Sequence, residues 1–297
     1  MLNLSLIRAA KDGDEVKVKR LISAGADVDA SLGDGTTALM LAALTGRTKA
    51  VEALLDAGAN PDAVDNMNNT ALIRAAHHGC SGTVRALLEH GASVNATDEG
   101  GWTALMFAVD LRDIDMVHEL IHFGADINHR ANSGLTAWLM PLGLYDGMDG
   151  HILNVLLEAG ADINSRDRFG RTALMDFAGK GNIGKVESLI ALGADINSKS
   201  DDGRSALMYA VAWHAPYGAI QKLIGLGADV NTTDSVGRTV LMYVAATDNA
   251  ELAELLLDHG ADVHAEDQWG WTAMRFARSN PWNSKVAALI RAAVARH

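Results

Sequence analysis

The sequence predicts an all-α protein, a solenoid of about nine helix–turn–helix–hairpin repeats. A Gly-Ala pair followed by a short polar turn recurs at intervals of 33 to 36 residues. A second motif, of the type Thr-Ala-Leu-Met, keeps step with the first. The glycines of the first series are Gly25, Gly58, Gly91, Gly124, Gly160, Gly193, Gly227 and Gly260. Two motifs locked together at this period indicate stacked repeats rather than a closed globular domain, which excludes most enzyme architectures.

Each repeat is expected to begin with a short inner helix. In the second repeat, Thr37 precedes the apolar segment 38–44, and its hydroxyl can accept a hydrogen bond from an early backbone N–H of that helix. Gly46 ends the helix, because glycine readily adopts positive φ values. The Thr-Ala-Leu-Met motif therefore predicts where the inner helices start.

An outer helix is expected to follow at about 48–57. Its apolar residues Val51, Leu54 and Leu55 have the i, i+3, i+4 spacing of a single buried face. Gly58 then supplies the positive φ that the C-terminus of a helix commonly requires. Neither helix can bury its apolar face alone, so we expect neighbouring repeats to complete one continuous core.

This pattern resembles the ankyrin repeat, and the resemblance covers essentially the whole chain. The Thr-Pro-Leu-His start of that family is Thr-Ala-Leu-Met here, and the Gly-Ala-Asp-Val-Asn finish is identical at residues 227–231. The Thr-Ala-Leu-Met form is more similar to bacterial ankyrin proteins than to typical animal ones. The resemblance implies a scaffold that binds another protein, without catalysis and without a cofactor.

A single domain is predicted over residues 1–297, because the repeats run nearly end to end. The first repeat, at about 1–31, lacks the Thr-Ala-Leu segment. The last, at about 265–297, finishes without a Gly-Ala-Asp turn. Solenoids need polar terminal repeats to stay soluble, so these two are expected to cap the array.

The repeat at about 131–164 departs from the others. It is three residues longer, and it contains Pro141 and three glycines within 143–150. Proline and glycine do not sustain a regular inner helix. Two interpretations remain open: a tolerated insertion in a connecting loop, or a protruding loop that presents Tyr145 and Met148 to a partner. The seventh repeat has one extra residue within 213–217, a milder form of the same change.

Composition limits the class of partner and the compartment. The formal net charge of −12 argues against a general nucleic-acid binder, because phosphate contacts need a basic surface. No stretch approaches the roughly 20 apolar residues that cross a bilayer. Cys80 is the single cysteine and cannot form an internal disulfide, which fits a reducing, cytoplasmic compartment. We therefore expect a monomer with no nucleic-acid or membrane partner.

The candidate partner-binding residues follow from the resemblance, because ankyrin proteins usually bind through hairpin tips and the exposed side of the first helices. The position just before the capping Thr or Ser holds Trp102, Leu135, Arg171, Arg204, Arg238 and Trp271. Other hairpin positions hold Arg130, Arg166 and Lys199, and Phe169 and Trp269. Tyr209 and Tyr243 lie on inner helices, where they can equally fill the groove between repeats.

Three consecutive repeats place an arginine before the cap, and this row is expected to be exposed and to pair with the carboxylates of an acidic partner. Arg, Trp and Tyr dominate interface energetics. The alternative is that Asp167, Asp201, Asp202 and Asp234 of the chain itself balance these charges.

Residues 118–122 match His-Glu-x-x-His, the zinc-protease helix. Their register argues against metal, because His118 and His122 align with interchangeable polar residues of other repeats. An outer helix is also expected to offer no cleft. His77 and His78 are interpreted as surface residues, and no metal site or cofactor is predicted.

The function expected from these observations is non-covalent binding of a protein partner, possible roles being inhibitor, immunity factor or antitoxin. An adaptor, or a secreted effector directed at a host protein, fits the same chemistry. An enzyme built on the solenoid is the remaining, less favoured alternative.

Overall fold

The computed structural model describes residues 1–140, 150–247, 249–279 and 284–295. These ranges contain seventeen α-helices and no β-strand, so the predicted all-α class is confirmed. The chain folds as two compact units, Met1–Asp162 and Ile163–His297. None of the helices in the described ranges combines the length and the apolar character that a membrane span needs.

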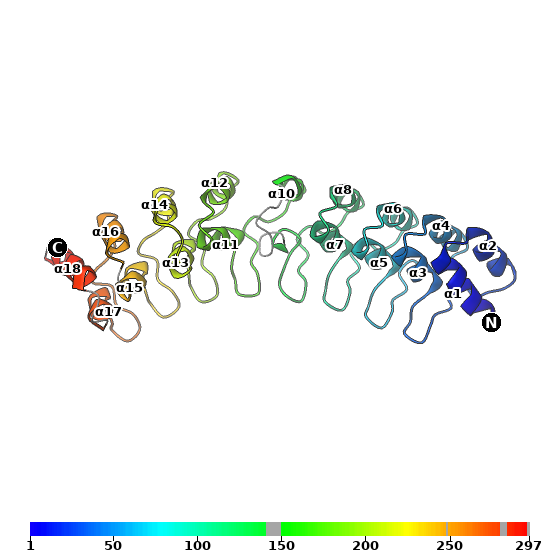
Figure 1. The fold of residues 1–297 in the computed structure, drawn as a ribbon, viewed down its shortest axis with the longest axis horizontal. Coiled ribbons are helices and arrows are strands. Elements are labelled where there is room, and N and C mark those ends of the chain that lie inside the picture. The colour runs from blue at the N-terminus through cyan, green and yellow to red at the C-terminus, as the bar shows by residue number, and fades with distance from the viewer. Residues whose placement is uncertain (141–149, 248, 280–283, 296–297) are drawn as a thin grey trace. The chain divides into compact units, whose positions relative to one another are not determined.

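The first unit alternates inner and outer helices along the chain (Figure 1). The inner helices are α1 (Leu2–Asp12), α3 (Ala38–Leu44), α5 (Ala71–His77) and α7 (Ala104–Asp110). The outer helices are α2 (Glu15–Ser23), α4 (Thr48–Asp56), α6 (Ser81–Glu89), α8 (Ile114–His122) and α10 (Gly150–Glu158).

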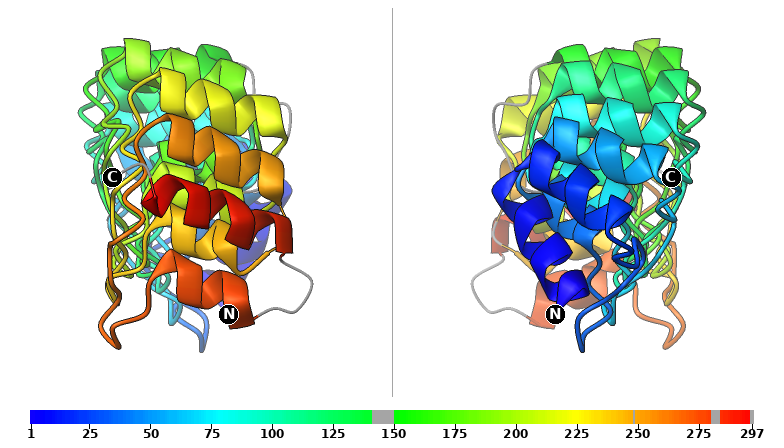
Figure 2. Two further views of the ribbon diagram at one scale, coloured as in Figure 1. Left: turned by 90° about the vertical axis from the view of Figure 1, so that its left-hand side faces the viewer. Right: turned by 90° about the vertical axis from the view of Figure 1, so that its right-hand side faces the viewer.

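The second unit has the same alternation. Its inner helices are α11 (Ala173–Gly179), α13 (Ala206–Ala212), α15 (Val240–Ala245) and α17 (Ala273–Ser279). Its outer helices are α12 (Ile183–Ala191), α14 (Tyr217–Gly225), α16 (Ala250–Asp258) and α18 (Ser284–Val294). Within each unit the inner helices form one layer, the outer helices form a second, and the hairpin loops extend to one side (Figures 1 and 2).

The inner helices begin where the Thr-Ala-Leu-Met motif predicts. The Thr37 hydroxyl accepts a hydrogen bond from the Met40 N–H at 3.2 Å. The same i to i+3 cap occurs at Thr70, Thr103, Thr172, Ser205 and Thr239. Each cap satisfies one of the backbone N–H groups that a helix leaves without a partner in its first turn.

The outer helices bury the predicted face. Val51 and Leu54 of α4 are fully buried, and Leu55 is nearly so. Gly58 has φ 87°, as expected for the residue that turns the chain away from a helix end. The core of each unit lies between the two helix layers and continues from one repeat to the next, because inner helices pack against inner helices and outer helices against outer helices.

A ladder of asparagine side chains joins successive polar turns. The Asn95 side-chain oxygen accepts from the Asp126 N–H at 2.7 Å, while its amide donates to the Gly124 carbonyl at 3.2 Å. Asn128, Asn197 and Asn231 make the same pair of bonds to the turn of the following repeat. These bonds join neighbouring repeats at their polar turns, and in the first two repeats Asp29 and Asp62 accept in the same place.

An aspartate holds most of the hairpin tips closed. One carboxylate oxygen of Asp65 accepts from the N–H groups of Met67 at 2.8 Å and Asn69 at 2.9 Å. Asp167, Asp234 and Asp267 accept from the equivalent pair of N–H groups. The residue before the cap therefore has its backbone fixed by a carboxylate, which leaves its side chain in a defined place.

Of the two repeats with extra residues, only the seventh has its longer segment within the described residues. The predicted irregularity between Pro141 and Gly150 lies outside the described residues, as do Tyr145 and Met148. The extra residue of the seventh repeat is accommodated between α13 and α14, where His214 has φ 59° and Pro216 precedes α14. That insertion leaves both helices intact.

Candidate functional site

The predicted arginine row lies in the second unit, but its guanidinium groups already have partners. Arg171 donates from Nε to Asp167 Oδ2 at 2.9 Å, and its Nη2 lies 2.7 Å from the same oxygen. Arg204 Nε lies 3.2 Å from Asp202 Oδ2, and Arg238 Nε lies 3.6 Å from Asp267 Oδ2. The three arginines are therefore not fully exposed, and aspartates of the chain balance their charges, as the alternative interpretation holds; their pairing with a partner stays a prediction. Each side chain is half-buried against a carboxylate of its own or the next hairpin.

The inner-helix tyrosines are part of the same hydrogen-bonded structure. Tyr209 is only 6% exposed, and its hydroxyl donates to Ser200 Oγ at 3.2 Å. The Tyr243 hydroxyl donates to Asp234 Oδ2 at 2.5 Å. Burial raises the pKa of both phenols, and the Asp234 hydrogen bond raises that of Tyr243 further. The interpretation of these residues as groove-filling is confirmed for Tyr209, although its ring also lines a pocket.

Position 276 shows what happens when this inner-helix donor is missing. The residue nine positions after a hairpin aspartate is Tyr243 for Asp234 and Phe276 for Asp267. Because Phe276 carries no donor, Asp267 Oδ2 makes no hydrogen bond with any described residue, although the side chain is only 1% exposed. Among the described residues, Arg238 is the cation that pairs with it; its Nε lies 3.6 Å from Oδ2, too far for a hydrogen bond.

Aromatic rings and cations alternate along the hairpin side of the second unit. Phe169 is 51% exposed, and the guanidinium carbons of Arg168 and Arg171 lie 4.7 and 5.3 Å from its ring centre. Trp269 is 56% exposed, with the Arg238 guanidinium at 5.4 Å. We call this face the arginine–aromatic surface. It consists of Arg168, Phe169, Arg171, Arg204, Tyr209, Trp213, Arg238, Tyr243, Trp269, Trp271, Arg275 and Phe276.

A pocket of about 330 Å³ opens on this surface. Arg168, Phe169, Arg171, Asp201, Asp202, Tyr209 and Trp213 line it. Two glycines shape it, because a Cβ added at Gly179 would overlap the Trp213 ring and one added at Gly170 would overlap Asp201. The indole of Trp213, 40% exposed, meets the Tyr209 ring edge-on at 5.6 Å between ring centres. The walls are thus held by packing that only glycine at 170 and 179 permits.

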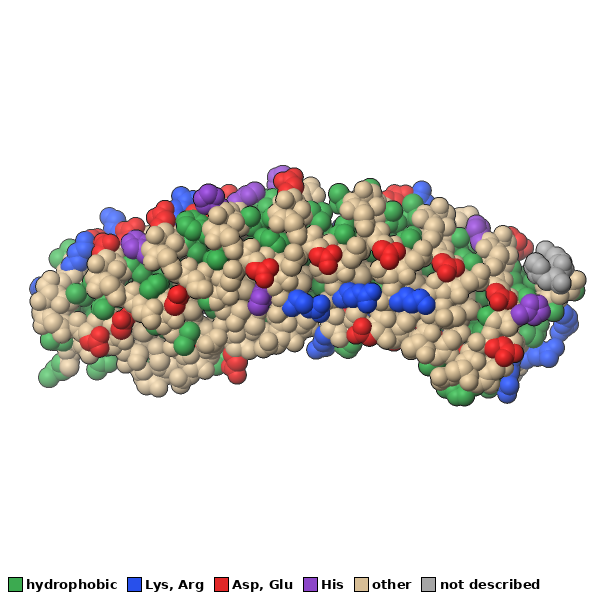
Figure 3. Space-filling model, turned by 180° about the vertical axis from the view of Figure 1, so that it is seen from behind, with side chains coloured by type: hydrophobic (Ala, Val, Ile, Leu, Met, Phe, Trp, Pro, Cys, Tyr) green, Lys and Arg blue, Asp and Glu red, His purple; other side chains and the backbone are tan. Residues whose placement is uncertain are grey.

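The remaining predicted residues have different surroundings. Arg130, Arg166 and Lys199 are exposed, and Lys199 Nζ donates to the Thr233 carbonyl at 2.8 Å. Trp102 is half-buried against Phe107, at 5.1 Å between ring centres. Leu135 is half-buried, and Trp271 lies under the Arg275 guanidinium at 4.3 Å. On the face shown in Figure 3, several Lys and Arg side chains lie next to one another near the middle, with acidic side chains above them.

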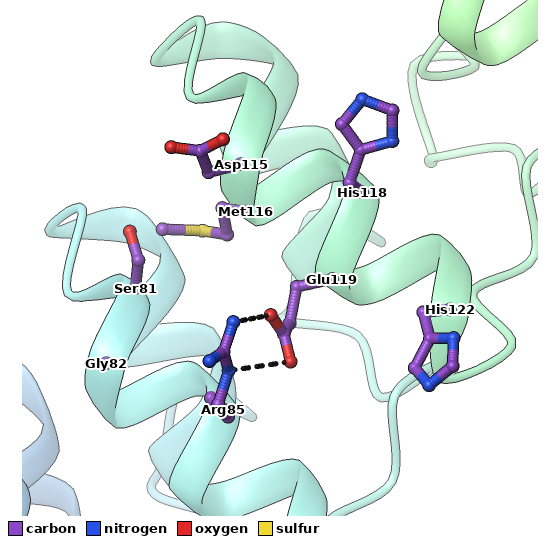
Figure 4. Close-up of a pocket in the computed structure, with 8 residues that line it drawn as sticks. All are labelled: Ser81, Gly82, Arg85, Asp115, Met116, His118, Glu119 and His122. Carbon is purple, nitrogen blue, oxygen red and sulfur yellow. Dashed lines mark hydrogen bonds and ion pairs between the residues drawn. The ribbon is translucent and has the colours of Figure 1, made fainter.

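The His-Glu-x-x-His segment lies on α8, beside a groove that the sequence did not predict. The groove has a volume of about 620 Å³ and runs between α6 and α8 (Figure 4), which corrects the expectation of no cleft. His118 and His122 are exposed on the outer helix and Leu120 is buried, as their register predicts. Glu119 turns to Arg85 on α6, accepting from its Nε at 3.0 Å. A glutamate engaged in this way is not poised as a base, and no cluster of three metal-ligating side chains occurs among the described residues.

His77 and His78 are both exposed, as interpreted from the sequence, and the His77 ring contacts Phe107 at 4.7 Å between ring centres. Their imidazoles therefore belong to the surface of α5 and its C-terminal turn.

Sequence reasoning assigned four of the pocket-lining residues to no site, namely Arg168, Asp201, Asp202 and Trp213, and it did not single out Gly179. One signal was available, because Trp213 stands at the start of the segment 213–217 in which the seventh repeat has its extra residue. The need for Gly179 could not be read from its own repeat, since the ring it accommodates comes from the next one.

Comparison with known proteins agrees with this architecture. A family model described as ankyrin repeats in three copies matches residues 6–98, 83–131, 144–234 and 212–294. The ankyrin repeat domain of Bcl-3, a member of the IkappaB protein family, is 28% identical, with a TM-score of 0.66 over 74% of this chain and 97% of that one. The ankyrin repeat protein EF0377 is 29% identical, with a TM-score of 0.58 over 63% of this chain and 96% of that one. No curated protein sequence matches. These matches extend over most of the repeats, and the chain belongs to the ankyrin-repeat family.

Proposed function

We propose that the protein binds a protein partner through the arginine–aromatic surface of its second unit. Ankyrin repeats are generally protein–protein interaction modules, and they are typically non-catalytic. The single observation that carries the proposal is the set of exposed rings, Phe169, Trp213 and Trp269, held on one side of the second unit. Large exposed aromatic groups on a rigid scaffold are the side chains that dominate interface energetics.

Preorganisation supports the choice of this surface. The hairpin aspartates fix the backbone at the tips, and guanidinium groups lie over the Phe169 and Trp269 rings. Less side-chain entropy is lost on binding when rings and guanidinium groups are already ordered. Arg171, Arg204 and Arg238 accordingly act as supports of the surface rather than as its free charges.

The proposed acidic patch of the partner would meet other basic groups. Arg166 and Arg168 are exposed and make no ion pair with any described residue. Such groups can pair with carboxylates of a partner without first breaking an internal bond. We place Arg130 and Lys199 with them as a basic margin that affects encounter rate and specificity more than affinity.

The biological role follows from what binding at this surface would do. An inhibitor, immunity factor or antitoxin would use it to occlude a partner enzyme, and an adaptor or effector would use it to hold one. A monomer in the reducing cytoplasm is the state we propose, supported by a single thiol, Cys80, whose pKa burial raises and which is therefore poorly reactive.

The test is capture of partners by the full chain immobilised as wild type and as the double variant Phe169→Ala/Trp269→Ala. A matched control, Val64→Ala/Met67→Ala, removes two exposed apolar side chains from a hairpin of the first unit. We expect a partner that is retained by the wild type and the control and lost by the double variant. Equal retention by all three would place the interface elsewhere.

A further inference from the structure

In the pocket between the hairpins at residues 167–171 and 200–204, the ring of Trp213 has no described cation stacked on it. On the arginine–aromatic surface, the rings of Phe169, Tyr243, Trp269, Trp271 and Phe276 each have an arginine of the chain nearby, at 4.3 to 5.7 Å from ring centre to guanidinium carbon. No described cation of this chain lies over the Trp213 ring, which is nevertheless exposed at the mouth of the pocket.

The same pocket contains a carboxylate without a partner. Asp201 is exposed, and its backbone N–H donates to the Phe169 carbonyl at 3.0 Å, but its carboxylate makes no hydrogen bond or ion pair with any described residue. The neighbouring Asp202 is paired with Arg204 and accepts from Ser200 Oγ at 2.5 Å. Asp201 is fixed in place because it packs against Gly170, where any side chain would collide with it.

We infer that this pocket receives an arginine side chain of the protein partner. The guanidinium would stack on the Trp213 indole and donate to Asp201, completing the ring–cation–carboxylate arrangement that Arg238 makes with Trp269 and Asp267 within the chain. The inference rests on the proposed function and specifies what one subsite of that surface recognises.

Charge favours a cation over an anion at this position. The lining residues carry two arginines and two aspartates. Arg171 is neutralised by Asp167 at 2.7 Å, and Asp202 by Arg204, so Arg168 and Asp201 remain. Arg168 stacks on the Phe169 ring, whereas the Asp201 carboxylate and the Trp213 ring line the same pocket without a described cation beside them. An aromatic face attracts a cation and repels an anion, so the Trp213 ring and the Asp201 carboxylate both favour a positive group.

Arginine suits the pocket better than lysine for a geometric reason. A volume of about 330 Å³ is at the small end of ligand pockets and accommodates one long side chain. A planar guanidinium can stack on the indole and still present several N–H groups to a carboxylate in its own plane, whereas an ammonium is a point charge without a stacking face.

The experiment is selection of random peptides displayed on phage against the full-length chain, followed by affinity measurement of the enriched peptides. We expect the enriched peptides to share an arginine. Replacing it by norleucine should weaken binding about tenfold, and replacing it by lysine should weaken binding by a smaller factor. Trp213→Ala and Asp201→Asn in the protein should each weaken binding by about five- to tenfold.

Two control variants make the result specific. Glu254→Gln removes one exposed carboxylate on the outer helix α16 and should leave peptide affinity unchanged. Circular dichroism and thermal unfolding test whether Trp213→Ala and Asp201→Asn are folded, and the isosteric change Asp201→Asn is expected to keep the shape of the pocket.

The outcomes separate this inference from the proposed function. Peptides that lack a common arginine, or that bind Asp201→Asn and Trp213→Ala as tightly as wild type, overturn the arginine pocket. If those peptides still lose affinity for Phe169→Ala or Trp269→Ala, the proposed surface stands. Peptides indifferent to all of these substitutions overturn both, and a selection that enriches no peptide on the wild-type chain overturns the pocket.

Discussion

The two units use the same repeat but present different hairpin surfaces. In the first unit the exposed large apolar side chains of the hairpins are aliphatic, Val64 and Met67. In the second unit they are the aromatic Phe169 and Trp269, and guanidinium groups lie over their rings. Caps, glycines and core are alike in both, so the scaffold does not determine the surface. The variable hairpin positions do.

The largest expected effect concerns the arginines that support the second unit. Changing Arg171, Arg204 and Arg238 together to Glu removes three ion pairs and places like charges beside Asp167, Asp202 and Asp267. Because the three are half-buried, we expect a loss of about 3 kcal/mol in the free energy of unfolding, discounted for solvent screening. Urea unfolding measures it. Arg166→Glu/Arg168→Glu is the control, expected to change stability by less than about 1 kcal/mol because both side chains are exposed and form no ion pair with a described residue.

The buried ion pair of the first unit is the next test. Arg74 donates from Nε to Asp65 Oδ2 at 3.2 Å and contacts Thr36 Oγ1 at 3.3 Å. Arg74→Met leaves the buried carboxylate with fewer donors, and we expect a loss of about 2 kcal/mol at neutral pH. An unchanged urea midpoint would show that this pair contributes nothing net to the first unit.

Acid unfolding sharpens the same comparison. Burial by itself would raise the pKa of Asp65, but hydrogen bonds from the Asn69 N–H and from Arg74 outweigh it and hold the pKa below its usual range. The stability that Asp65 contributes is therefore present above its unfolded pKa of about 3.9 and is lost as pH falls through the lower folded pKa. In Arg74→Met the folded pKa rises, so the loss should begin at higher pH, which equilibrium unfolding across the acid range would detect.

A smaller gain is expected at the end of the second unit. Phe276→Tyr would provide Asp267 Oδ2 with the donor that Tyr243 gives Asp234, and we expect about 1 kcal/mol of added stability. Phe107→Tyr in the first unit is the matched control. It lies nine residues after Asp98, which is half-buried and can reach water, so its gain should be smaller. Equal gains at both positions would contradict the idea that Asp267 Oδ2 is destabilised by lacking a hydrogen-bond donor.

The smallest effect on stability, but an informative one, concerns Gly179→Ala. A Cβ at 179 would overlap the Trp213 ring, while alanine favours helix over glycine by about 1 kcal/mol, so the two effects offset each other. Displacement of the indole should then appear without unfolding. Fluorine NMR of the labelled tryptophans, with Trp213→Phe assigning the signal, would show a shifted Trp213 resonance. An unmoved resonance would mean that the ring does not rest on Gly179.

The parts of the fold that sequence predicted correctly depend on short-range chemistry. Thr37 caps a helix and Gly58 ends one through contacts within a few residues, and the motif period repeats both. The sequence left open whether the hairpin arginines face a partner or are balanced by aspartates of the chain itself. The identity of a neighbour such as Asp167 does not show whether it binds the arginine, because the hairpin backbone determines that geometry.

The pocket depended on packing between repeats. Trp213 and Gly179 meet across adjacent repeats, and Asp201 is placed by Gly170 of the preceding hairpin. A periodic sequence indicates which positions are equivalent. It does not indicate that a large side chain such as Trp213 will occupy the space beside a glycine of the neighbouring repeat. The groove between α6 and α8 was not predicted for the same reason.

The asparagine ladder constrains how such a chain can lengthen. Asn95, Asn164 and Asn231 reach a turn 31 residues ahead, whereas Asn197 spans 32 residues and Asn128 spans 34 to make the same bond. The extra residues of the longer repeats therefore stand in the sequence before the next polar turn, and that turn still makes the same hydrogen bond to the asparagine. Growth of the array by duplication of whole repeats preserves every rung. A single residue added inside a polar turn would disrupt its asparagine hydrogen bonds to both the preceding and the following repeat. We therefore expect length variation to be confined to segments between the helices.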